Sequence, residues 1–468
     1  MRFLPTTTLA ALGLAFTVPA VTASAANPAD DGVVMASDAP DASYGQDYAQ
    51  PTGYSTPVLP MGAGPGPIHP YSADAMDCYG CPPSGNAFAE GWHAPPQCSR
   101  AWVNFEYLYW QPKGINVPAL VTTSPVRTAQ TVAGELGQPT TSVLYGDGEI
   151  NDDYRAGGRL QGGFWLAPDE MAGIEGHVFS FDDEQSVFTA NGSFSNGGAG
   201  PILARPFFNV DSALQDTLLL AYPDFVTGNQ TIDLDGSVDV RSESEIQSAG
   251  VLFRRISWMD VLDSSGVSFV RIYGLIGYRY FNLDEQLSID STIRPIGGSF
   301  GNNSSVRSSD LFDTENEFHG GELGIDTQIN RGSFFLKILT KAALGNTHQT
   351  VNIAGSTVSS DGVNSTTFAG GLLAQPTNIG EITSDHFSVL PEGNITVGCQ
   401  LTRNVAVTGG YSFLYLSNVV RPGDQIDFSV NPTQFDGGVL IGEARPTASI
   451  NHDDFWMHGF NAGVEVTW

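Results

Sequence analysis

Residues 455–468 read FWMHGFNAGVEVTW, and the chain ends on this stretch. One parity carries the apolar and aromatic residues Phe460, Ala462, Val464, Val466 and Trp468. The other parity carries polar or small residues. Because the side chains of a strand alternate between two faces, the pattern predicts a β-strand with one apolar and one polar face. Soluble sheets and membrane barrels both contain such strands, so the alternation alone does not choose between them.

The composition favours a β-rich protein and argues against a nucleic-acid partner. Charged residues make up 15% of the 468 residues, and 54 residues are glycine. An ordinary soluble domain has about 25% charged residues. The formal net charge is -30, from 50 acidic and 20 basic residues. Binding to nucleic-acid phosphates needs a basic surface, which this balance does not provide.

The first 25 residues, MRFLPTTTLAALGLAFTVPAVTASA, have the organisation of a secretory signal peptide. Arg2 precedes an apolar core, and small residues at 23–25 supply a cleavage site after Ala25. A membrane anchor is the alternative, but the apolar run is too short to span a bilayer. No later run reaches the roughly 18 apolar residues of a transmembrane helix, so none is expected. The sequence therefore predicts an exported protein.

Residues 26–100 are rich in Pro, Gly and Tyr and have no periodicity, which predicts a disordered linker. The linker contains the cysteines Cys78, Cys81 and Cys98. Pro82 follows the C-x-x-C pair where covalent haem attachment needs a histidine, so that chemistry is excluded. A disulfide formed in an oxidising compartment is the preferred interpretation. The alternative is a zinc site with His69 or His93 as the fourth ligand.

Strand-like runs begin at residue 101. We find ten such runs, at 101–111, 156–168, 173–183, 242–256, 266–283, 317–329, 333–345, 386–401, 405–420 and 455–468. Short links alternate with long polar stretches, such as 184–235 and 421–453. Outer-membrane barrels have short periplasmic turns, long extracellular loops and an even number of strands. The alternation predicts an all-β fold, a transmembrane antiparallel β-barrel of about 10 strands (10–12).

Such a barrel explains the terminal stretch. The last strand must pair with run 101–111, because lipid cannot satisfy an open sheet edge. A final aromatic residue would lie at the membrane interface. The stretch resembles the C-terminal sorting signal of bacterial outer-membrane barrels, and its signal residues would be Phe460, Val464, Val466 and Trp468. Outer-membrane lipid and the outer-membrane assembly machinery are therefore the expected partners, and the bacterial outer membrane is the expected location.

Seven sequence blocks resemble a known family in content and order. They are FEYLYWQPKG (105–114), PALVTTSP (118–125), LIGYRYFNLDEQL (275–287), NEFHGGELGID (316–326), KAALGNTHQTVNIAG (341–355), GGLLAQPTNIG (370–380) and GYSFLYLSNVVRPGDQID (410–427). These blocks resemble the bacterial family named putative beta-barrel porin seven. The resemblance covers about residues 101–468 and implies an outer-membrane β-barrel. It implies no particular substrate.

The polar parity of the runs predicts the residues that line the lumen. They are Glu106, Arg159, Glu175, Arg255, Arg271, Arg279, Glu322, Asp326, Lys337, Lys341, Glu392 and Glu465. Ten strands lie near the size at which side chains fill a barrel. An interlocked ionic core is therefore favoured over a wide pore, and a narrow gated path is the alternative. Arg271 and Arg279 in one run should meet Glu322 and Asp326 in the next.

No motif predicts an enzyme, a metal or a cofactor. The sequence has neither a G-x-S-x-G nor an H-E-x-x-H motif, and its eight histidines are scattered. His177 and His386 fall on the lumen parity, where a structural histidine is the expected role. The acidic segments 233–239 and 451–454 lack the ligand spacing of a calcium loop, so solvated loops are expected.

Two functions remain open at this point. Porin-like passage of small solutes is the leading expectation, and it rests on analogy with the fold. The alternative is a structural or surface-interaction barrel with a filled lumen, whose acidic extracellular loops would bind calcium or a partner.

Overall fold

The computed structural model describes residues 100–468, except for 167–169, 196–198, 263–267 and 302. The predicted signal peptide 1–25 and residues 26–99 of the predicted linker 26–100, with Cys78, Cys81 and Cys98, lie outside these residues. Among the described residues, no helix has the length and apolarity needed to cross a bilayer.

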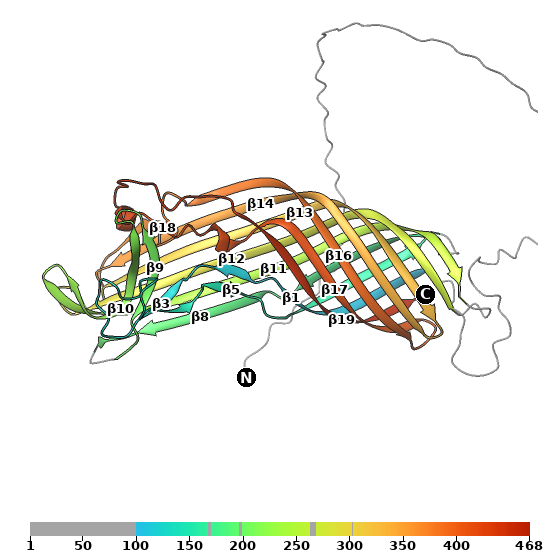
Figure 1. Ribbon diagram of the computed structural model, residues 1–468, viewed down its shortest axis with the longest axis horizontal. Coiled ribbons are helices and arrows are strands. Elements are labelled where there is room, and N and C mark those ends of the chain that lie inside the picture. The colour runs from blue at the N-terminus through green and yellow to red at the C-terminus, as the bar shows by residue number, and fades with distance from the viewer. Residues whose placement is uncertain (1–99, 167–169, 196–198, 263–267, 302) are drawn as a thin grey trace, which may run out of the picture. The chain divides into compact units, whose positions relative to one another are not determined.

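Ten antiparallel strands of the described residues form a closed ring (Figure 1). In ring order they are β1 (Ala101–Pro112), β6 (Arg155–Trp165), β7 (Ala172–Phe181), β11 (Gln230–Val261), β12 (Ser268–Ile296), β13 (Ser305–Arg331), β14 (Phe334–Ser360), β16 (Gly380–Gln400), β17 (Val405–Val420) and β19 (His452–Thr467). Each of the ten predicted runs coincides with one of these strands. The prediction of a ten-stranded antiparallel barrel is confirmed.

The last strand closes the ring against the first, as the terminal stretch predicts. Phe105 pairs with Val464 and Trp102 with Thr467 in the antiparallel register of β1 and β19. The main chain continues this contact, because the Arg100 amide donates to the Trp468 carbonyl at 2.7 Å. We call the end of the ring that carries Trp468 and the short turns the proximal end, and the opposite end the distal end.

The outer wall is apolar in the proximal half of the ring. Ile276 and Tyr278 of β12 project outward and are exposed, whereas Tyr273 and Arg279 point inward and are buried. Other strands contribute exposed outward residues of the same kind, including Phe105, Leu160, Val251, Leu323, Leu344, Ile395, Tyr411 and Phe460. Apolar outside and polar inside is the pattern of a barrel wall in lipid.

The same strands reverse this pattern toward the distal end. Every outward residue of β12 from Asn282 to Asp290 is polar. The inward residues Leu283, Leu287 and Ile289 are fully buried. A polar outer face over an apolar inner face is typical of a water-exposed sheet. β12 therefore passes without interruption from a lipid-facing wall into a water-facing one.

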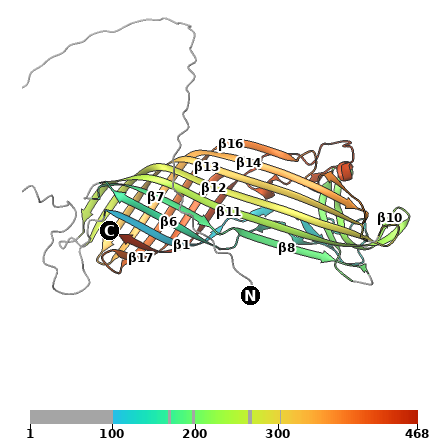
Figure 2. The same cartoon turned by 180° about the vertical axis from the view of Figure 1, so that it is seen from behind.

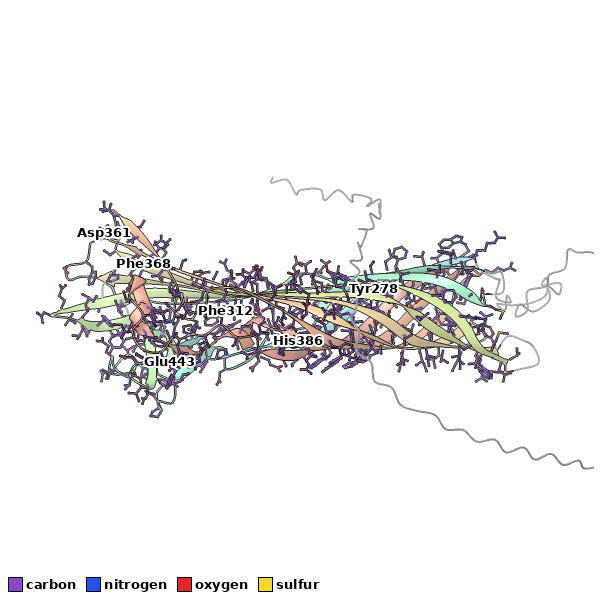
Figure 3. All side chains as sticks on the ribbon, turned by 90° about the horizontal axis from the view of Figure 1, so that it is seen from above. Tyr278, Phe312, Asp361, Phe368, His386 and Glu443 are labelled. Carbon is purple, nitrogen blue, oxygen red and sulfur yellow. The ribbon has the colours of Figure 1, made fainter. Side chains whose placement is uncertain are left out.

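The distal extension has its own hydrophobic core. Its members include Val238, Val240, Leu287, Ile289, Phe312, Val351 and Ile353 from the long strands and Leu203, Phe207, Leu219, Leu220, Leu372 and Leu373 from the connections. Figure 1 shows the connecting strands gathered at this end. In Figure 3, Asp361, Phe368 and Glu443 lie at the distal end and Tyr278 toward the proximal one.

Shorter strands fill and cover the distal end. They are β2 (Ile115–Val117), β3 (Val121–Thr123), β4 (Ser142–Tyr145), β5 (Gly148–Ile150), β8 (Glu184–Gly192), β9 (Leu203–Asn209), β10 (Leu214–Thr227), β15 (Ser365–Ala369) and β18 (Ser429–Val430). Figure 2 shows β8 following β11 beyond the end of β7. Two 3₁₀ turns, η2 (Pro422–Gln425) and η3 (Pro432–Gly437), complete the connection before β19.

The long connections are more structured than the sequence suggested. The stretch 184–235 contains β8, β9, β10 and the start of β11. Residues 284–316 were expected to be a long polar loop, but only 297–304 connect β12 and β13. The expectation was wrong because it placed apolar residues on the outer face throughout. Above the lipid the outer face is polar, so a strand there has the composition of a loop.

Candidate functional site: the barrel lumen

The centre of the lumen contains a charge-balanced layer contributed by six strands. Its three cations and three anions are Arg159, Arg279, Lys341, Glu106, Glu322 and Glu392, and all six side chains are buried. Glu392 is the hub of the layer. It lies 3.0 Å from Arg279, 3.3 Å from Lys341 and 3.9 Å from Arg159.

Glu322 and Glu106 hold the two sides of this layer. Glu322 lies 3.2 Å from Lys341 and 3.8 Å from Arg279. Glu106 lies 3.3 Å from Arg159 and accepts a hydrogen bond from the Asn461 amide at 3.0 Å. We call these six charged residues the central ionic layer. Its formal charges sum to zero, which reduces the cost of burying them.

Aromatic rings and one histidine complete the layer. The Arg159 guanidinium lies 5.2 Å from the centre of the Trp110 ring, and that of Arg279 lies 5.4 Å from the Phe179 ring. His177 of β7 is buried and its Nε2 contacts the Arg279 guanidinium. A neutral Nε2 can accept from an arginine, so His177 fits the structural role expected from its parity.

A second set of ion pairs lies between this layer and the proximal end. Arg254 of β11 forms hydrogen-bonded pairs with Glu175 and Asp326, each at 2.8 Å. Its guanidinium also lies 4.3 Å from the centre of the Tyr273 ring. Arg271 pairs with Glu170 at 2.6 Å, and Lys337 pairs with Glu465.

The prediction from strand parity is wrong for one lumen residue. Arg255 is exposed on the outer face, and its neighbour Arg254 occupies the lumen. Val251 and Phe253 project outward, so Arg255 shares their parity. The other eleven predicted residues, Glu106, Arg159, Glu175, Arg271, Arg279, Glu322, Asp326, Lys337, Lys341, Glu392 and Glu465, point inward and join the ion pairs described above.

The sequence predicted that two arginines of β12 pair with two carboxylates of β13, and this is correct for one arginine and wrong for the other. Arg279 pairs with Glu322. Arg271 pairs with Glu170 instead of Asp326, which is taken by Arg254. The reason is the register: Asp326 lies opposite Tyr273, and Arg271 lies one inward step closer to the proximal end. From there it reaches the connection between β6 and β7.

An apolar layer lies directly distal to the ionic layer. It comprises Leu108, Trp110, Phe179, Phe181, Ile246, Phe281, Leu283, Phe318, Ala343, Leu390, Leu414, Leu416, Val419, Phe455 and Met457. Every member is less than 5% exposed, so the layer packs as a protein core does.

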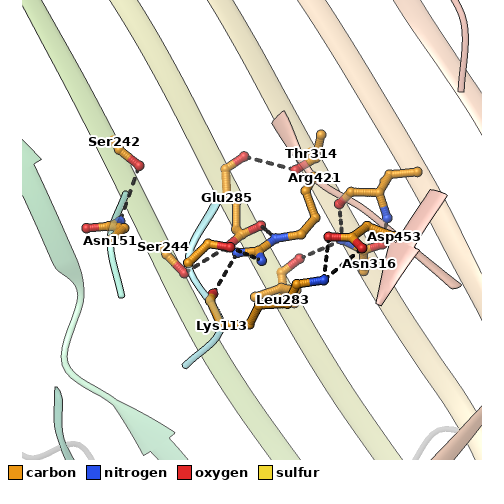
Figure 4. A network of polar contacts seen from close by, with 12 residues as sticks. Lys113, Asn151, Ser242, Ser244, Leu283, Glu285, Thr314, Asn316, Arg421 and Asp453 are labelled. Atoms are coloured by element: carbon orange, nitrogen blue, oxygen red, sulfur yellow. Dashed lines mark hydrogen bonds and ion pairs between the residues drawn. The ribbon is translucent and has the colours of Figure 1, made fainter. Parts of the chain in front are cut away.

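Above the apolar layer, a loop enters the lumen and is held by Arg421 (Figure 4). We call residues 420–426 the plug, which begins at the last residue of β17. The Arg421 guanidinium donates to both Glu285 oxygens, at 2.8 and 2.6 Å, and to the Gly114 carbonyl at 2.6 Å. The Val420 amide donates to Asn316 at 2.7 Å. These bonds tie the plug to β12, β13 and the segment after β1.

The plug also carries a carboxyl group with altered acidity. Burial raises the pKa of Asp424 to about 6, and the nearby Asp453 charge acts in the same direction. Asp453 itself lies 2.8 Å from Lys113, and Asp454 pairs with the same ammonium. The segment 451–454 is therefore engaged with the chain and is not a freely solvated loop.

The other acidic segment, 233–239, lies inside β11 and not in a loop. Asp235 accepts hydrogen bonds from the amides of Phe194 and Ser195 and from the hydroxyls of Ser193 and Ser195. Burial opposes ionisation of Asp235, but these bonds outweigh it and lower its pKa. Across the described residues, no group of three or more His, Cys, Asp or Glu side chains is placed to hold a metal ion.

Besides the pairs made by Arg254 and by Arg271, two further buried ion pairs among the described residues were not predicted from the sequence. Arg421 and Glu285 hold the plug, and Arg205 pairs with Asp310 at 2.6 Å in the distal core. Asp310 also accepts from the amides of Leu373 and Ala374. Glu285 interrupts a row of buried apolar residues on the inward face of β12, and that interruption is the signal that could have revealed it. Asp310 lies among mixed polar and apolar inward residues of β13, so no such signal marks it in the sequence.

A closed antiparallel ring with an apolar outer wall and a charged interior defines a bacterial outer-membrane β-barrel protein. The chain belongs to the family described as Putative beta barrel porin-7, which it matches over residues 102–468. The family resemblance of the sequence is confirmed. The location of the protein is the bacterial outer membrane.

Comparison with solved structures finds other outer-membrane proteins at low identity. Outer-membrane protease OmpT from Escherichia coli is 7% identical, over 79% of this chain and 97% of that one, with a TM-score of 0.35. The outer-membrane channel DcaP of Acinetobacter baumannii is 8% identical, over 79% and 98%, with a TM-score of 0.14. The toluene transporter TodX of P. putida is 7% identical, over 79% and 90%, with a TM-score of 0.13. No curated protein sequence matches.

Proposed function

We propose that this protein is a closed outer-membrane barrel whose extracellular β-extension is its working part, in a structural or surface-interaction role. The observation that carries the proposal is the filled lumen. The central ionic layer, the apolar layer and the plug follow one another along the barrel axis. A dissolved solute would have to separate paired charges and then cross a packed core, and both steps are costly.

The distal extension supports the second half of the proposal. Strands β11 to β14 continue well beyond the lipid-facing wall and enclose a core of their own. A barrel that served only as a wall would not need such a structure. Its outward residues are polar, so it presents a large water-facing surface on the cell exterior.

Gated passage of small solutes is the second candidate. Several contacts in the central ionic layer are long, such as 3.8 Å between Arg279 and Glu322 and 3.9 Å between Arg159 and Glu392. Such contacts are weaker than aligned, hydrogen-bonded pairs and would rearrange more easily. A gate would require displacement of the plug, an opening through the apolar layer and this rearrangement.

Planar-bilayer recording on the purified full chain tests the choice. We expect no steady conductance, either in the wild type or in Arg421→Ala, because the ionic and apolar layers remain when the plug loosens. An open porin reconstituted in the same way is the positive control. Stable single-channel steps in the wild type would overturn the closed-barrel proposal. Steps confined to Arg421→Ala would favour the gated path.

We also propose that the chain is not an enzyme and that its partners are lipid and the assembly machinery. His177 is buried and its Nε2 contacts the Arg279 guanidinium, which suits a structural role better than a catalytic one. Phe460, Val464 and Trp468 of the predicted assembly signal project outward and are exposed on the ring. An outward apolar row is available to the machinery while β19 is still unpaired.

A further inference from the structure

The lipid-facing wall carries an open groove that a closed barrel does not need. Its volume is about 1120 Å³, and it crosses the outer face of β1, β6, β7 and their neighbours, which lie side by side in Figure 2. Phe105, Leu160 and Val178 line it and are exposed. The inward residues that border it, such as Glu106 and Arg159, have buried side chains, so the groove lies outside the wall and not in the lumen.

Strand pairing arranges the lining in two adjacent rows. The first row consists mainly of large apolar side chains that lie opposite one another on neighbouring strands, including Val464, Phe105, Leu160 and Val178. The second row lies one outward step closer to the distal end and is paired in the same strand order, with Ala462, Tyr107, Gly158, Ser180 and Gln247. The groove runs between these two rows.

Small side chains give the groove its depth. Ala462, Gly158 and Ser180 of the second row lie beside the large residues of the first. A Cβ built on Gly158 would meet no heavy atom within 4 Å, so the space above this glycine is open. In lipid, no hydrophobic effect drives apolar groups together, and van der Waals packing decides which contacts persist. A furrow gives an acyl chain more of these contacts than a flat wall does.

The groove crosses the apolar band obliquely, because the strands of a membrane barrel are tilted. At one end the first row meets β19 at Val464, close to the chain end at Trp468. At the other end the second row meets β11 at Gln247, which lies opposite the polar residue Asn282. Four strand spacings of about 4.8 Å separate these two strands, or about 19 Å. That length exceeds half of the roughly 30 Å hydrocarbon core, so it accommodates an acyl chain of one leaflet.

Carboxylates lie just beyond the polar end of the groove. The next two outward rows across β11, β12 and β13 contain Glu245, Asp284 and Glu315 in one row, and Glu243 and Asp313 in the other. On these three described strands, neither row contains a lysine or an arginine. A headgroup that carries an ammonium is attracted to such a surface, and a headgroup whose only charge is a phosphate is repelled.

We propose that this groove binds one membrane lipid whose headgroup carries an amine, with an acyl chain between the two rows and the headgroup beside Gln247. The groove is continuous with the lipid-facing wall, so the bilayer supplies the ligand. A second copy of the chain fits less well, because its own acidic rows would lie at the same level and like charges repel. The site lies outside the lumen, so binding is independent of whether the barrel conducts.

Native mass spectrometry of the delipidated full chain in detergent tests the proposal. Phosphatidylethanolamine is the amine-bearing probe, and phosphatidylglycerol with the same acyl chains is the anionic comparison. We expect one retained phosphatidylethanolamine per chain and about fivefold weaker retention of phosphatidylglycerol, because of the charge difference between the headgroups. Equal retention of the two lipids would overturn the proposal, and so would retention of neither.

Two matched glycine variants locate the lipid. Gly158→Leu places a side chain in the groove, and we expect about fivefold less retained phosphatidylethanolamine because packing contacts are lost. Gly321→Leu makes the same change on the outer face of β13, away from the groove, where a Cβ also meets no heavy atom within 4 Å. Retention in Gly321→Leu should equal that of the wild type. If Gly158→Leu fails to give the folded band on an unheated gel, Ala249→Leu replaces it.

Equal retention in the two glycine variants would show that the lipid binds elsewhere on the wall and would overturn the proposal. A wild-type dimer that Gly158→Leu abolishes would assign the groove to a second copy, and would overturn it as well.

A second pair of variants tests the headgroup. Glu245→Gln combined with Asp284→Asn removes two carboxylates beyond the polar end, and should bring the retention of the two lipids closer together. Glu381→Gln combined with Asp385→Asn makes the same changes at exposed carboxylates of β16, away from the groove, and should leave the preference unchanged. An unaltered preference in the first double variant would contradict recognition of the amine by these carboxylates and overturn the proposal.

Discussion

Arg279→Met is the change that most directly tests the central ionic layer. Arg279 is fully buried, and its charge faces Glu392 at 3.0 Å and Glu322 at 3.8 Å. Without it the layer retains two cations against three carboxylates. Breaking a buried pair by removing one partner costs about 3–5 kcal/mol, because an uncompensated charge remains. We expect a loss of that size in the free energy of unfolding.

The assay is urea unfolding of protein refolded into lipid vesicles, followed by tryptophan fluorescence and by the folded band on an unheated gel. Arg241→Met is the matched control, because it removes an exposed arginine from the water-facing part of the neighbouring strand β11. Surface changes of this kind usually stay within about 0.5 kcal/mol. Adding Glu392→Gln to Arg279→Met restores neutrality and should recover more than half of the loss.

A loss below about 1 kcal/mol in Arg279→Met would refute this reasoning. It would mean that water already screens the layer, as in an open channel. Failure of Glu392→Gln to rescue the variant would locate the effect in packing against Phe179 and not in charge.

Three further changes test the distal extension, the plug and the terminal strand. Asp310→Asn should lower the free energy of unfolding by about 3–5 kcal/mol, because it removes the buried partner of Arg205. Protease added to intact cells should then cut the loop whose Leu373 and Ala374 amides bind Asp310. Unchanged resistance to protease would contradict this role of Asp310. Burial raises the pKa of Asp424 to about 6, so its contribution to the folded plug is complete below about pH 4 and lost as the pH rises through about 6. Amide exchange in the plug, corrected for intrinsic rates, should therefore be slower at pH 5 than at pH 8. The free energy of local opening should differ by about 1 kcal/mol or less, because the site is partly exposed. Asp424→Asn should remove this difference. Val464→Asp with Val466→Asp places charge on the lipid face at up to about 2 kcal/mol each, and should deplete the folded protein from outer-membrane fractions; normal levels would show that this strand is not read during assembly.

The sequence predicted the ring because its constraints are local. Alternation along a strand and the order of short and long connections both follow from one polymer crossing a membrane repeatedly. The closing pair of β1 and β19 followed from the need to remove an open edge. Parity also placed Glu322, Lys341 and Glu392 in the lumen, though it could not decide which of two adjacent arginines in β11 points inward.

The partners of these charges could not be predicted in the same way. Arg271 reaches Glu170 in a turn, and Arg254 joins residues of β7 and β13 across the lumen. Such contacts depend on strand stagger and on how far a long side chain extends, and neither is written in the alternation. The plug depends on Arg421, which lies just after the last residue of β17 and has no periodic pattern around it.

The polarity reversal of the long strands is a property of the whole sheet and not of one strand. Gln247, Asn282, Glu317, His348 and Asp385 lie opposite one another on five neighbouring strands and form the first row of polar outward residues. Two rows closer to the proximal end, four of these strands present Val251, Tyr278, Leu344 and Val389, and β13 presents Gly321. Only a change of solvent explains a switch shared by adjacent strands within so few residues. If lipid is assumed to surround the whole strand, the water-facing half of such a strand is assigned to a loop. The number of polar residues cannot correct this error, because loops and water-facing strands are both rich in polar residues. The inward residues can correct the error, because Leu283, Leu287 and Ile289 keep the two-residue period of a strand where the outer face is no longer apolar.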